Sequence, residues 1–210
     1  MDTAGIKLAE YEDFHNYKKA ISSSLRKKAI RPCQKGDFVY EIEDYSESLW
    51  TDIEEIYSER QEDRVGRSTL SWAKNVVREL AATGMLKIST LKYEGKRVAY
   101  LIFFEIKGVD YIWLTAFKKV EKYQLGHYIR YCLIERAYAF GIDKVDMMRG
   151  AYAYKKQWDC STSVNCEMVY STRIYQKWLY VLRKKLRTKL RNYVYGNQRL
   201  FNLYKRYISK

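Results

Sequence analysis

Proline and glycine are scarce in this sequence. The 210 residues include one proline and ten glycines, which excludes collagen-like repeats and proline-rich linkers. No run of about 18 apolar residues occurs, so we expect no membrane-spanning helix. Hydrophobic residues still make up 47% of the chain, and 21 of the residues are tyrosines. This composition excludes wholesale disorder and predicts one domain, with or without an extension.

Histidine and cysteine are also few, and their spacing fits no metal site. The four cysteines include no CxxC pair, and the two histidines are His15 and His127. We therefore predict no bound metal and no disulfide scaffold. Residues 1–14 are polar and acidic, without the apolar core of a signal peptide. These features predict a cytoplasmic protein.

Acidic residues are missing from the C-terminal segment. Residues 173–210 contain twelve Lys and Arg and no Asp or Glu, which accounts for most of the net charge of +14. Residues 1–172 are therefore nearly neutral. The basic side chains of the segment alternate with Tyr, Trp and Leu, a mixture that suits an anionic membrane surface or the phosphates and bases of an RNA. A packed helix with a basic outer face is the third interpretation.

Hydrophobic periodicity predicts both helices and strands. Helices are expected over residues 8–31, 47–61, 70–83, 123–141 and 174–191, and strands over 37–43, 86–91, 97–106, 109–117, 142–148 and 165–172. The strands between residues 86 and 117 should form an antiparallel meander. Pro32 should end the first helix, and Gly196 should interrupt the last one before residue 210. The predicted fold class is α/β (α+β), with a mixed, mainly antiparallel sheet flanked by helices and a basic helical extension.

The start of the helix over residues 123–141 is a candidate ligand site. Unpaired backbone amides and the positive end of the helix dipole meet there, and Gly126 would let a ligand approach the backbone closely. These features suit a phosphate or pyrophosphate. A single glycine at a helix start is more often a simple turn, so further support is needed.

Several motifs provide that support. Residues 14–31 are rich in serine and basic residues, residues 56–70 place Arg60 ahead of a glycine and a serine, and residues 86–117 contain the meander. The most specific positions are Gly126, Gly141, Asp146, Gly150, Tyr154, Lys155 and Trp158. Over residues 14–172 this pattern resembles the CelD/BcsL-type (BioF2-like) branch of the GNAT acyltransferase superfamily, which is distantly similar to FemAB-type peptidyltransferases.

The resemblance implies acetyl-CoA or another acyl-CoA as a cofactor. Its pyrophosphate would rest on the start of the helix, and its pantetheine arm would lie between strands 111–117 and 144–148. The implied cofactor contacts are Trp113, Leu114, Thr115, Gln124, Leu125, Gly126, His127 and Tyr128. The loop lacks the family's usual second glycine, and FemAB-like relatives use an aminoacyl-tRNA, so both donors stay open. The implied organisation is an N-terminal helical segment (1–36), an acyltransferase domain (37–172) and a basic tail (173–210).

Three residues are candidates for the chemistry of acyl transfer, which needs a base, an oxyanion donor and an acid for the leaving group. Glu105 is the acid inside an otherwise apolar strand, where burial would raise its pKa and suit a general base; a solvated strand end is the alternative. His127 titrates near neutrality and could act as a base or a phosphate contact, or could simply pack. The family motif implies that Tyr154 protonates the leaving sulfur.

Substrate contacts are expected from Arg60, Asp146 and Lys155. Lys155 could bind an anionic group, or could be a surface lysine. Asp146 could orient a partner group, or could hold a neighbouring turn. The leading hypothesis is an N- or O-acyltransferase acting on a sugar, amine or polysaccharide precursor, peripheral to the inner face of a membrane. The alternatives are aminoacyl transfer from tRNA and a non-catalytic binding module.

A second GNAT-like half is common in this branch. Either one half suffices, or a partner chain supplies the second half, or two copies of this chain pair as a homodimer.

Overall fold

The computed structural model describes residues 2–61, 70–150, 153–164, 174–197 and 200. The chain divides into two units, one of residues 1–63 with 67–165 and the other of residues 64–66 with 166–210. The first unit contains the sheet and all helices but the last. Each unit is described here by itself.

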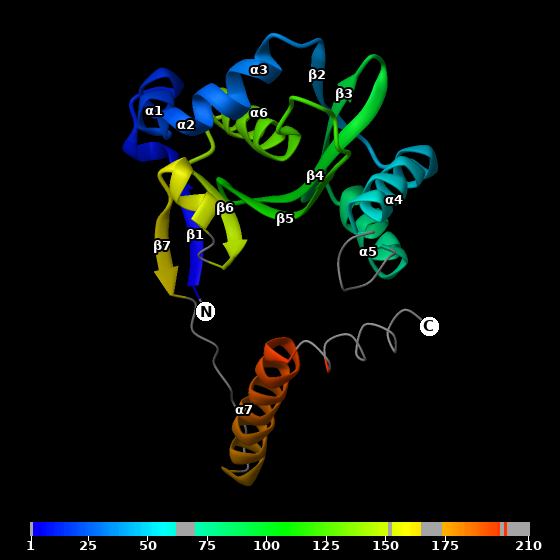
Figure 1. Cartoon of the computed structure of the whole chain (residues 1–210), viewed down its shortest axis with the longest axis vertical. Coiled ribbons are helices and arrows are strands. Elements are labelled where there is room, and N and C mark those ends of the chain that lie inside the picture. Colours follow the sequence, from blue (N-terminus) through cyan, green and yellow to red (C-terminus); the bar gives the residue numbers. More distant parts are fainter. Residues whose placement is uncertain (1, 62–69, 151–152, 165–173, 198–199, 201–210) are drawn as a thin grey trace. The chain divides into compact units, whose positions relative to one another are not determined.

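A seven-stranded sheet forms the centre of the first unit (Figure 1). Its spatial order is β2-β3-β4-β5-β6-β1-β7. The strands are β1 (Asp2–Lys7), β2 (Phe38–Glu43), β3 (Leu86–Tyr93), β4 (Lys96–Ile106), β5 (Val109–Phe117), β6 (Lys144–Arg149) and β7 (Ser161–Val164). Only β5 and β6 run parallel, and every other neighbouring pair is antiparallel. The predicted fold class and meander are confirmed.

Strand β1 was not expected from the sequence. It lies between β6 and β7 and pairs antiparallel with both. Ala4 and Ile6 are buried in the core, although the surrounding sequence is polar. The side chain of Lys144 packs directly against the backbone of Gly5. A Cβ at this position would lie only 2.6 Å from the Cε of Lys144. Only two apolar side chains mark this strand, too few for a periodicity argument. The expected strand at 165–172 falls outside the described residues.

The expected helix over residues 8–31 is divided into several pieces. They are η1 (Leu8–Glu10), α1 (Phe14–Ala20), α2 (Ser23–Leu25), the π-helical turn η2 (Arg26–Ile30) and α3 (Arg31–Gln34). The break falls at Ile21 and Ser22, whose backbones are extended. The Ser22 hydroxyl accepts a hydrogen bond from the Leu25 amide at 3.2 Å, so a new helix begins there.

Pro32 does not end the helix, contrary to the prediction. It lies in the first turn of α3, directly after η2. Proline has no amide hydrogen and clashes with the carbonyl four residues earlier in a regular α-helix. The wider π turn, in which the Arg31 amide donates to the Arg26 carbonyl, accommodates this residue. The helical path therefore continues from Ser23 to Gln34.

Helices cover both faces of the sheet (Figure 1). The N-terminal helices and α6 (Leu125–Ala139) pack on one face, and α4 (Glu47–Gln61) and α5 (Ser71–Ala82) pack on the other. Strand β4 is buried on both faces from Val98 to Phe103, which explains its continuous apolar sequence. Ser46 caps α4, since its hydroxyl accepts from the Leu49 amide at 3.1 Å. Ser68 and Thr69, which precede α5 in the sequence, lie outside the described residues.

Helix α7 (Ile174–Gly196) belongs to the second unit. It confirms the predicted helix and ends at the glycine where a break was predicted. Trp178, Leu182, Leu186 and Leu190 recur at every fourth position, and their side chains are exposed. No helix in the described part of the chain is both long and apolar enough to cross a membrane.

Candidate active site

Strands β5 and β6 part after a short paired stretch. Their parallel pairing covers Val109 to Tyr111, with Tyr111 opposite Asp146 as the last pair. Directly afterwards, β5 carries a bulge against β4, because Phe103 pairs with Ile112 and Ile102 pairs with Leu114. Trp113 is the extra residue. Bulges bend a strand and end its pairing, so this one accounts for the separation of the two strands.

A cavity of about 550 Å³ lies where the two strands part. Its lining combines both strands with α6 and the 3₁₀ helix η3 (Ala153–Trp158). The lining residues are Ile112, Trp113, Thr115, Arg130, Met147, Met148 and Tyr154. The hydroxyl oxygen of Thr115 is buried there, and none of the residues that the structure describes forms a hydrogen bond with it. A buried hydroxyl without a partner costs free energy, so this cavity suits a polar ligand.

Arg130 brings a cation to the same cavity. Its side chain is half-buried, its Nη1 donates to the Gly126 carbonyl, and its guanidinium lies 5.5 Å from the centroid of the Tyr154 ring. Burial lowers the pKa of Arg130. Within the described residues no carboxylate pairs with it. The cavity therefore contains a donor group for an oxyanion or another negative group.

His127 lies behind Tyr154 and does not line the cavity. Its ring stacks on Trp158 at 5.9 Å and meets Tyr154 edge-on at 6.0 Å. Burial, assisted by the positive charge of Arg130, lowers the pKa of His127 to about 4, so the imidazole is neutral at physiological pH. Its Nδ1 is buried and has no hydrogen-bond partner among the described residues. The imidazole is better placed to support Tyr154 than to take up a proton.

The start of α6 is more closed than the sequence suggests. The amides of His127 and Tyr128 both donate to the Gln124 carbonyl, at 2.9 and 3.1 Å. Gly126 is buried, and a Cβ at this position would lie 2.3 Å from the Phe117 ring. The glycine therefore allows Phe117 to pack against the helix. Phe117 thus occupies the space beside Gly126 that the sequence analysis left for a ligand.

Glu105 differs from its expected role. It forms ion pairs with Lys87 at 2.9 Å and with Arg136 at 2.7 Å. Burial alone would raise the pKa of Glu105, but the hydrogen bonds from both cations outweigh it and leave the pKa below its usual value. The expectation of a raised pKa is therefore wrong. Glu105 is not a lining residue of the cavity either.

The other expected contacts are spread over the unit. Asp146 bonds the Met148 amide at 2.7 Å and pairs with Lys144 at 2.8 Å, so it holds the end of β6. Lys155 is buried and donates to the carbonyls of Met147 and Met148 at 2.8 and 2.9 Å, and burial lowers its pKa. Met148 has a positive φ of 58°, and these bonds stabilise that strained turn.

Arg60 lies near the start of α6 but outside the cavity. Its guanidinium is 4.8 Å from the centroid of the Phe117 ring. Leu114 packs on the opposite face of the sheet, with α4 and α5. Of the expected site residues, the structure therefore brings Trp113, Thr115 and Tyr154 together at the cavity.

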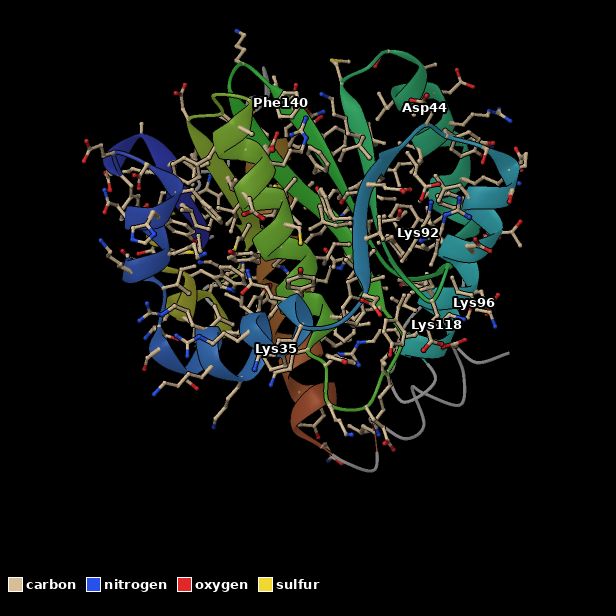
Figure 2. The ribbon with its side chains drawn as sticks, turned by 90° about the horizontal axis from the view of Figure 1, so that it is seen from above. Lys35, Asp44, Lys92, Lys96, Lys118 and Phe140 are labelled. Carbon is tan, nitrogen blue, oxygen red and sulfur yellow. The ribbon has the colours of Figure 1, made fainter. Side chains whose placement is uncertain are left out.

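A larger cavity of about 810 Å³ lies elsewhere, where β2 meets the ends of α5 and α6. Phe140 lies at its edge with 69% of its surface exposed, and Figure 2 shows Phe140 and Asp44 at the same end of the unit. None of the residues proposed for chemistry lines it. We place the site at the smaller cavity because the unpartnered Thr115 hydroxyl and Arg130 meet there.

Arg130 and the two methionines are site residues that the sequence analysis missed. Arg130 follows His127 by three residues and Gly126 by four, a spacing that puts all three on one helix face. That spacing was a usable signal. The sequence contains no comparable signal for the methionines, because Met147 and Met148 look like core residues of a short strand.

Comparison with known proteins identifies the family. The model of a GNAT acetyltransferase domain matches residues 21–156, and the chain belongs to this family. No curated protein matches the chain significantly.

Solved structures share the fold. They include FemX, with a TM-score of 0.62 and 12% identity over 77% of this chain and 59% of that one. L-PGS from Bacillus licheniformis has a TM-score of 0.59 and 13% sequence identity, over 77% of this chain and 57% of that one. The C-terminal domain of a putative lysylphosphatidylglycerol synthetase from Agrobacterium fabrum has a TM-score of 0.58 and 12% sequence identity. The match covers 77% of this chain and 57% of that one. The chain thus spans less than two thirds of each of these proteins.

Proposed function

We propose that this protein is an acyl-CoA-dependent N- or O-acyltransferase whose acyl group lies in the cavity between β5 and β6. The observation that supports this most is the unpartnered Thr115 hydroxyl in a cavity that opens where the two strands part. The family adds independent support, because the model that matches describes an acetyltransferase domain. The resemblance to the CelD/BcsL-type branch favours a sugar, an amine or a polysaccharide precursor as the acceptor.

The lining residues suggest how the transfer would proceed. The nitrogen or oxygen of the acceptor attacks the acyl carbon, and the bond from that carbon to the donor's sulfur breaks. Thr115 and Arg130 would donate hydrogen bonds to the carbonyl oxygen as it gains negative charge. Tyr154 would give its proton to the leaving sulfur and recover one from the acceptor through solvent. The cofactor supplies the activated acyl group.

Titration calorimetry with acetyl-CoA and longer acyl-CoAs tests this proposal. We expect saturable heat for at least one of them. Thr115→Val should weaken binding roughly threefold to tenfold, since one hydrogen bond is worth about 0.5–1.5 kcal/mol. The same change at Thr162, an exposed residue of β7, serves as a control. Absence of heat with every acyl-CoA, in folded protein, would contradict the proposal.

A second candidate donor is an aminoacyl-tRNA. The position of Phe117 against Gly126 favours it, because an ester-linked donor needs no pyrophosphate site at α6. The ester oxygen would then be the leaving atom, with Tyr154 in the same role. Filter binding of charged tRNA at increasing salt distinguishes the two donors, since contacts to phosphates weaken steeply with salt.

Helix α7 suggests where the protein acts. Its apolar positions and basic residues suit a helix that lies on an anionic bilayer, and a cytoplasmic protein would then bind the inner face of a membrane. If neither donor binds, a non-catalytic module attached in this way is the remaining function. Co-sedimentation with anionic vesicles, compared with neutral ones, tests this attachment.

A homodimer, or a complex with a partner that supplies a second GNAT-like half, would appear as a higher molar mass in light scattering.

A further inference from the structure

A second pocket lies among the N-terminal helices, away from the candidate active site. It has a volume of about 200 Å³ and is formed by α1, η2, α3 and one residue of α6. The floor is apolar, because Ile21, Ile30 and Tyr131 are almost fully buried. None of its lining residues also lines the cavity between β5 and β6.

The rim of this pocket is cationic. It carries His15, Lys18, Lys19, Arg26 and Arg31, and no acid lines the pocket. Over residues 14–36 the sequence has seven Lys and Arg and no Asp or Glu. Glu135 of α6 lies close enough to Lys18 to feel its charge: burial raises the pKa of Glu135, and Lys18 lowers it in part. The rim forms no ion pair within the described part of the chain.

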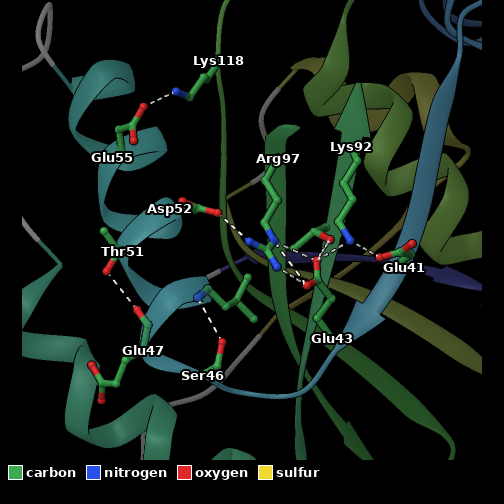
Figure 3. Close-up of polar contacts among 12 residues, drawn as sticks. Glu41, Glu43, Ser46, Glu47, Thr51, Asp52, Glu55, Lys92, Arg97 and Lys118 are labelled. Carbon is green, nitrogen blue, oxygen red and sulfur yellow. Dashed lines mark hydrogen bonds and ion pairs between the residues drawn. The ribbon is translucent and has the colours of Figure 1, made fainter. Parts of the chain in front are cut away.

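Several other surface cations of this unit are paired with carboxylates, among them the two shown in Figure 3. Arg97 pairs with Glu43 and Asp52, and Lys118 pairs with Glu55 (Figure 3). Figure 2 places Lys92, Lys96 and Lys118 beside α4, and Lys35 at the other side, at the end of α3. The difference matters because paired cations have little charge left for a ligand, whereas the rim of the N-terminal pocket keeps its charge.

The π turn explains why two guanidinium groups share this rim. Arg26 and Arg31 are joined by the backbone bond that closes the turn, from the Arg31 amide to the Arg26 carbonyl. In a regular α-helix, residues five apart differ by about 140° around the helix axis, and the wider π turn, whose bond joins residues five apart, brings them nearer to one face. Such turns are rare, and they occur frequently at functional sites. Here the turn also accommodates Pro32.

We propose that this pocket binds a phosphate monoester through the forked guanidinium groups of Arg26 and Arg31, with Lys18 and Lys19 adding charge. Arginine matches the geometry of phosphate oxygens with two parallel hydrogen bonds. The volume is below the roughly 300–1,000 Å³ of pockets that enclose a whole drug-sized ligand. It therefore suits a headgroup-sized ester, whether free in solution or on a phospholipid. The site is independent of the proposed acyl transfer.

Binding of glycerol 3-phosphate by calorimetry and of vesicles with and without phosphatidic acid by co-sedimentation tests the pocket. The full chain, R26Q/R31Q and K27Q/K28Q are compared. Lys27 and Lys28 are exposed on the same turn and do not line the pocket, so both variants lose the same charge. We expect R26Q/R31Q to weaken binding at least tenfold, because the charge-assisted hydrogen bonds of both guanidinium groups are lost, and K27Q/K28Q to change it less than about twofold.

The two ligands distinguish the source of the phosphate. Binding of both, or of vesicles alone, identifies a lipid headgroup, and binding of glycerol 3-phosphate alone identifies a soluble ester. Failure of both ligands to bind would overturn the proposal. So would equal losses in the two variants, which would indicate a diffuse attraction for polyanions, RNA included. The variant R26K/R31K keeps the charge and the fold but loses the paired N–H donors of the guanidinium groups. We expect it to bind the phosphate ester severalfold more weakly than the unmodified chain.

Discussion

Replacing Gly126 by alanine separates its two possible roles, ligand approach and packing. A Cβ here would lie 2.3, 2.8 and 2.9 Å from three carbons of the Phe117 ring, so the ring must move. Overpacking of this kind costs about 1–3 kcal/mol, and alanine recovers up to about 1 kcal/mol of helix propensity. We expect a net loss of about 1–2 kcal/mol in the free energy of unfolding, or roughly 2–8 °C in Tm.

A double-mutant cycle with Phe117→Ala gives the decisive comparison. Without the ring, Gly126→Ala should be neutral or slightly stabilising, so the coupling energy should reach about 2 kcal/mol. Urea denaturation of the four proteins measures it. A coupling near zero, together with an intact Tm and lost acyl-CoA binding in Gly126→Ala alone, would refute the packing argument and restore the helix start as a ligand site.

Three further predictions concern titratable groups. Burial raises the pKa of Asp110 from 3.8 to about 6, so the folded state retains a proton that the unfolded state has lost. The contribution of Asp110 to the free energy of unfolding should therefore fall by about 3 kcal/mol as pH rises from about 4 to 6, with the Arg136 guanidinium at 3.3 Å acting against the shift; Asp110→Asn should remove this contribution in denaturation curves measured across that range. His127 stays neutral above pH 5, so the pH-rate profile should keep its shape near pH 6.5 when His127 is changed to Gln; a lost inflection would contradict its buried position. Glu105→Gln should lower stability by about 1 kcal/mol through the loss of its two ion pairs, while turnover stays unchanged. A turnover collapse at intact Tm would return Glu105 to the chemistry.

The meander and α6 could be predicted from the sequence because their signals are local. The apolar run of β4, the glycines at Gly95 and Gly108 and the apolar positions of α6 are signals that act within a few residues. The divergence of β5 and β6 came from family resemblance, since the bulge at Trp113 has no local signature. The family itself is confirmed, whereas the roles of individual site residues stay predictions.

The closed start of α6 could not be predicted, because it depends on a contact between distant residues. Gly126 has the same appearance in the sequence whether a ligand or Phe117 lies against it. The prediction of a raised pKa for Glu105 failed for a similar reason, since its ion-pair partners Lys87 and Arg136 come from other elements of the fold. The π turn at Arg26 was missed because proline normally ends a helix, and only the fold reveals the wider turn that admits it.

The position of β1 has a consequence for how this unit is completed during synthesis. Its two neighbours in the sheet, β6 and β7, are made more than a hundred residues later. Until then Ala4 and Ile6 have no partners, and the loop that must close is among the longest in the unit, which slows folding. Strand β1 therefore stays unpaired during synthesis until β6 and β7 have been made. A substitution that disturbs this pairing would act at that late step, beside the strand that contributes Met147 and Met148 to the cavity.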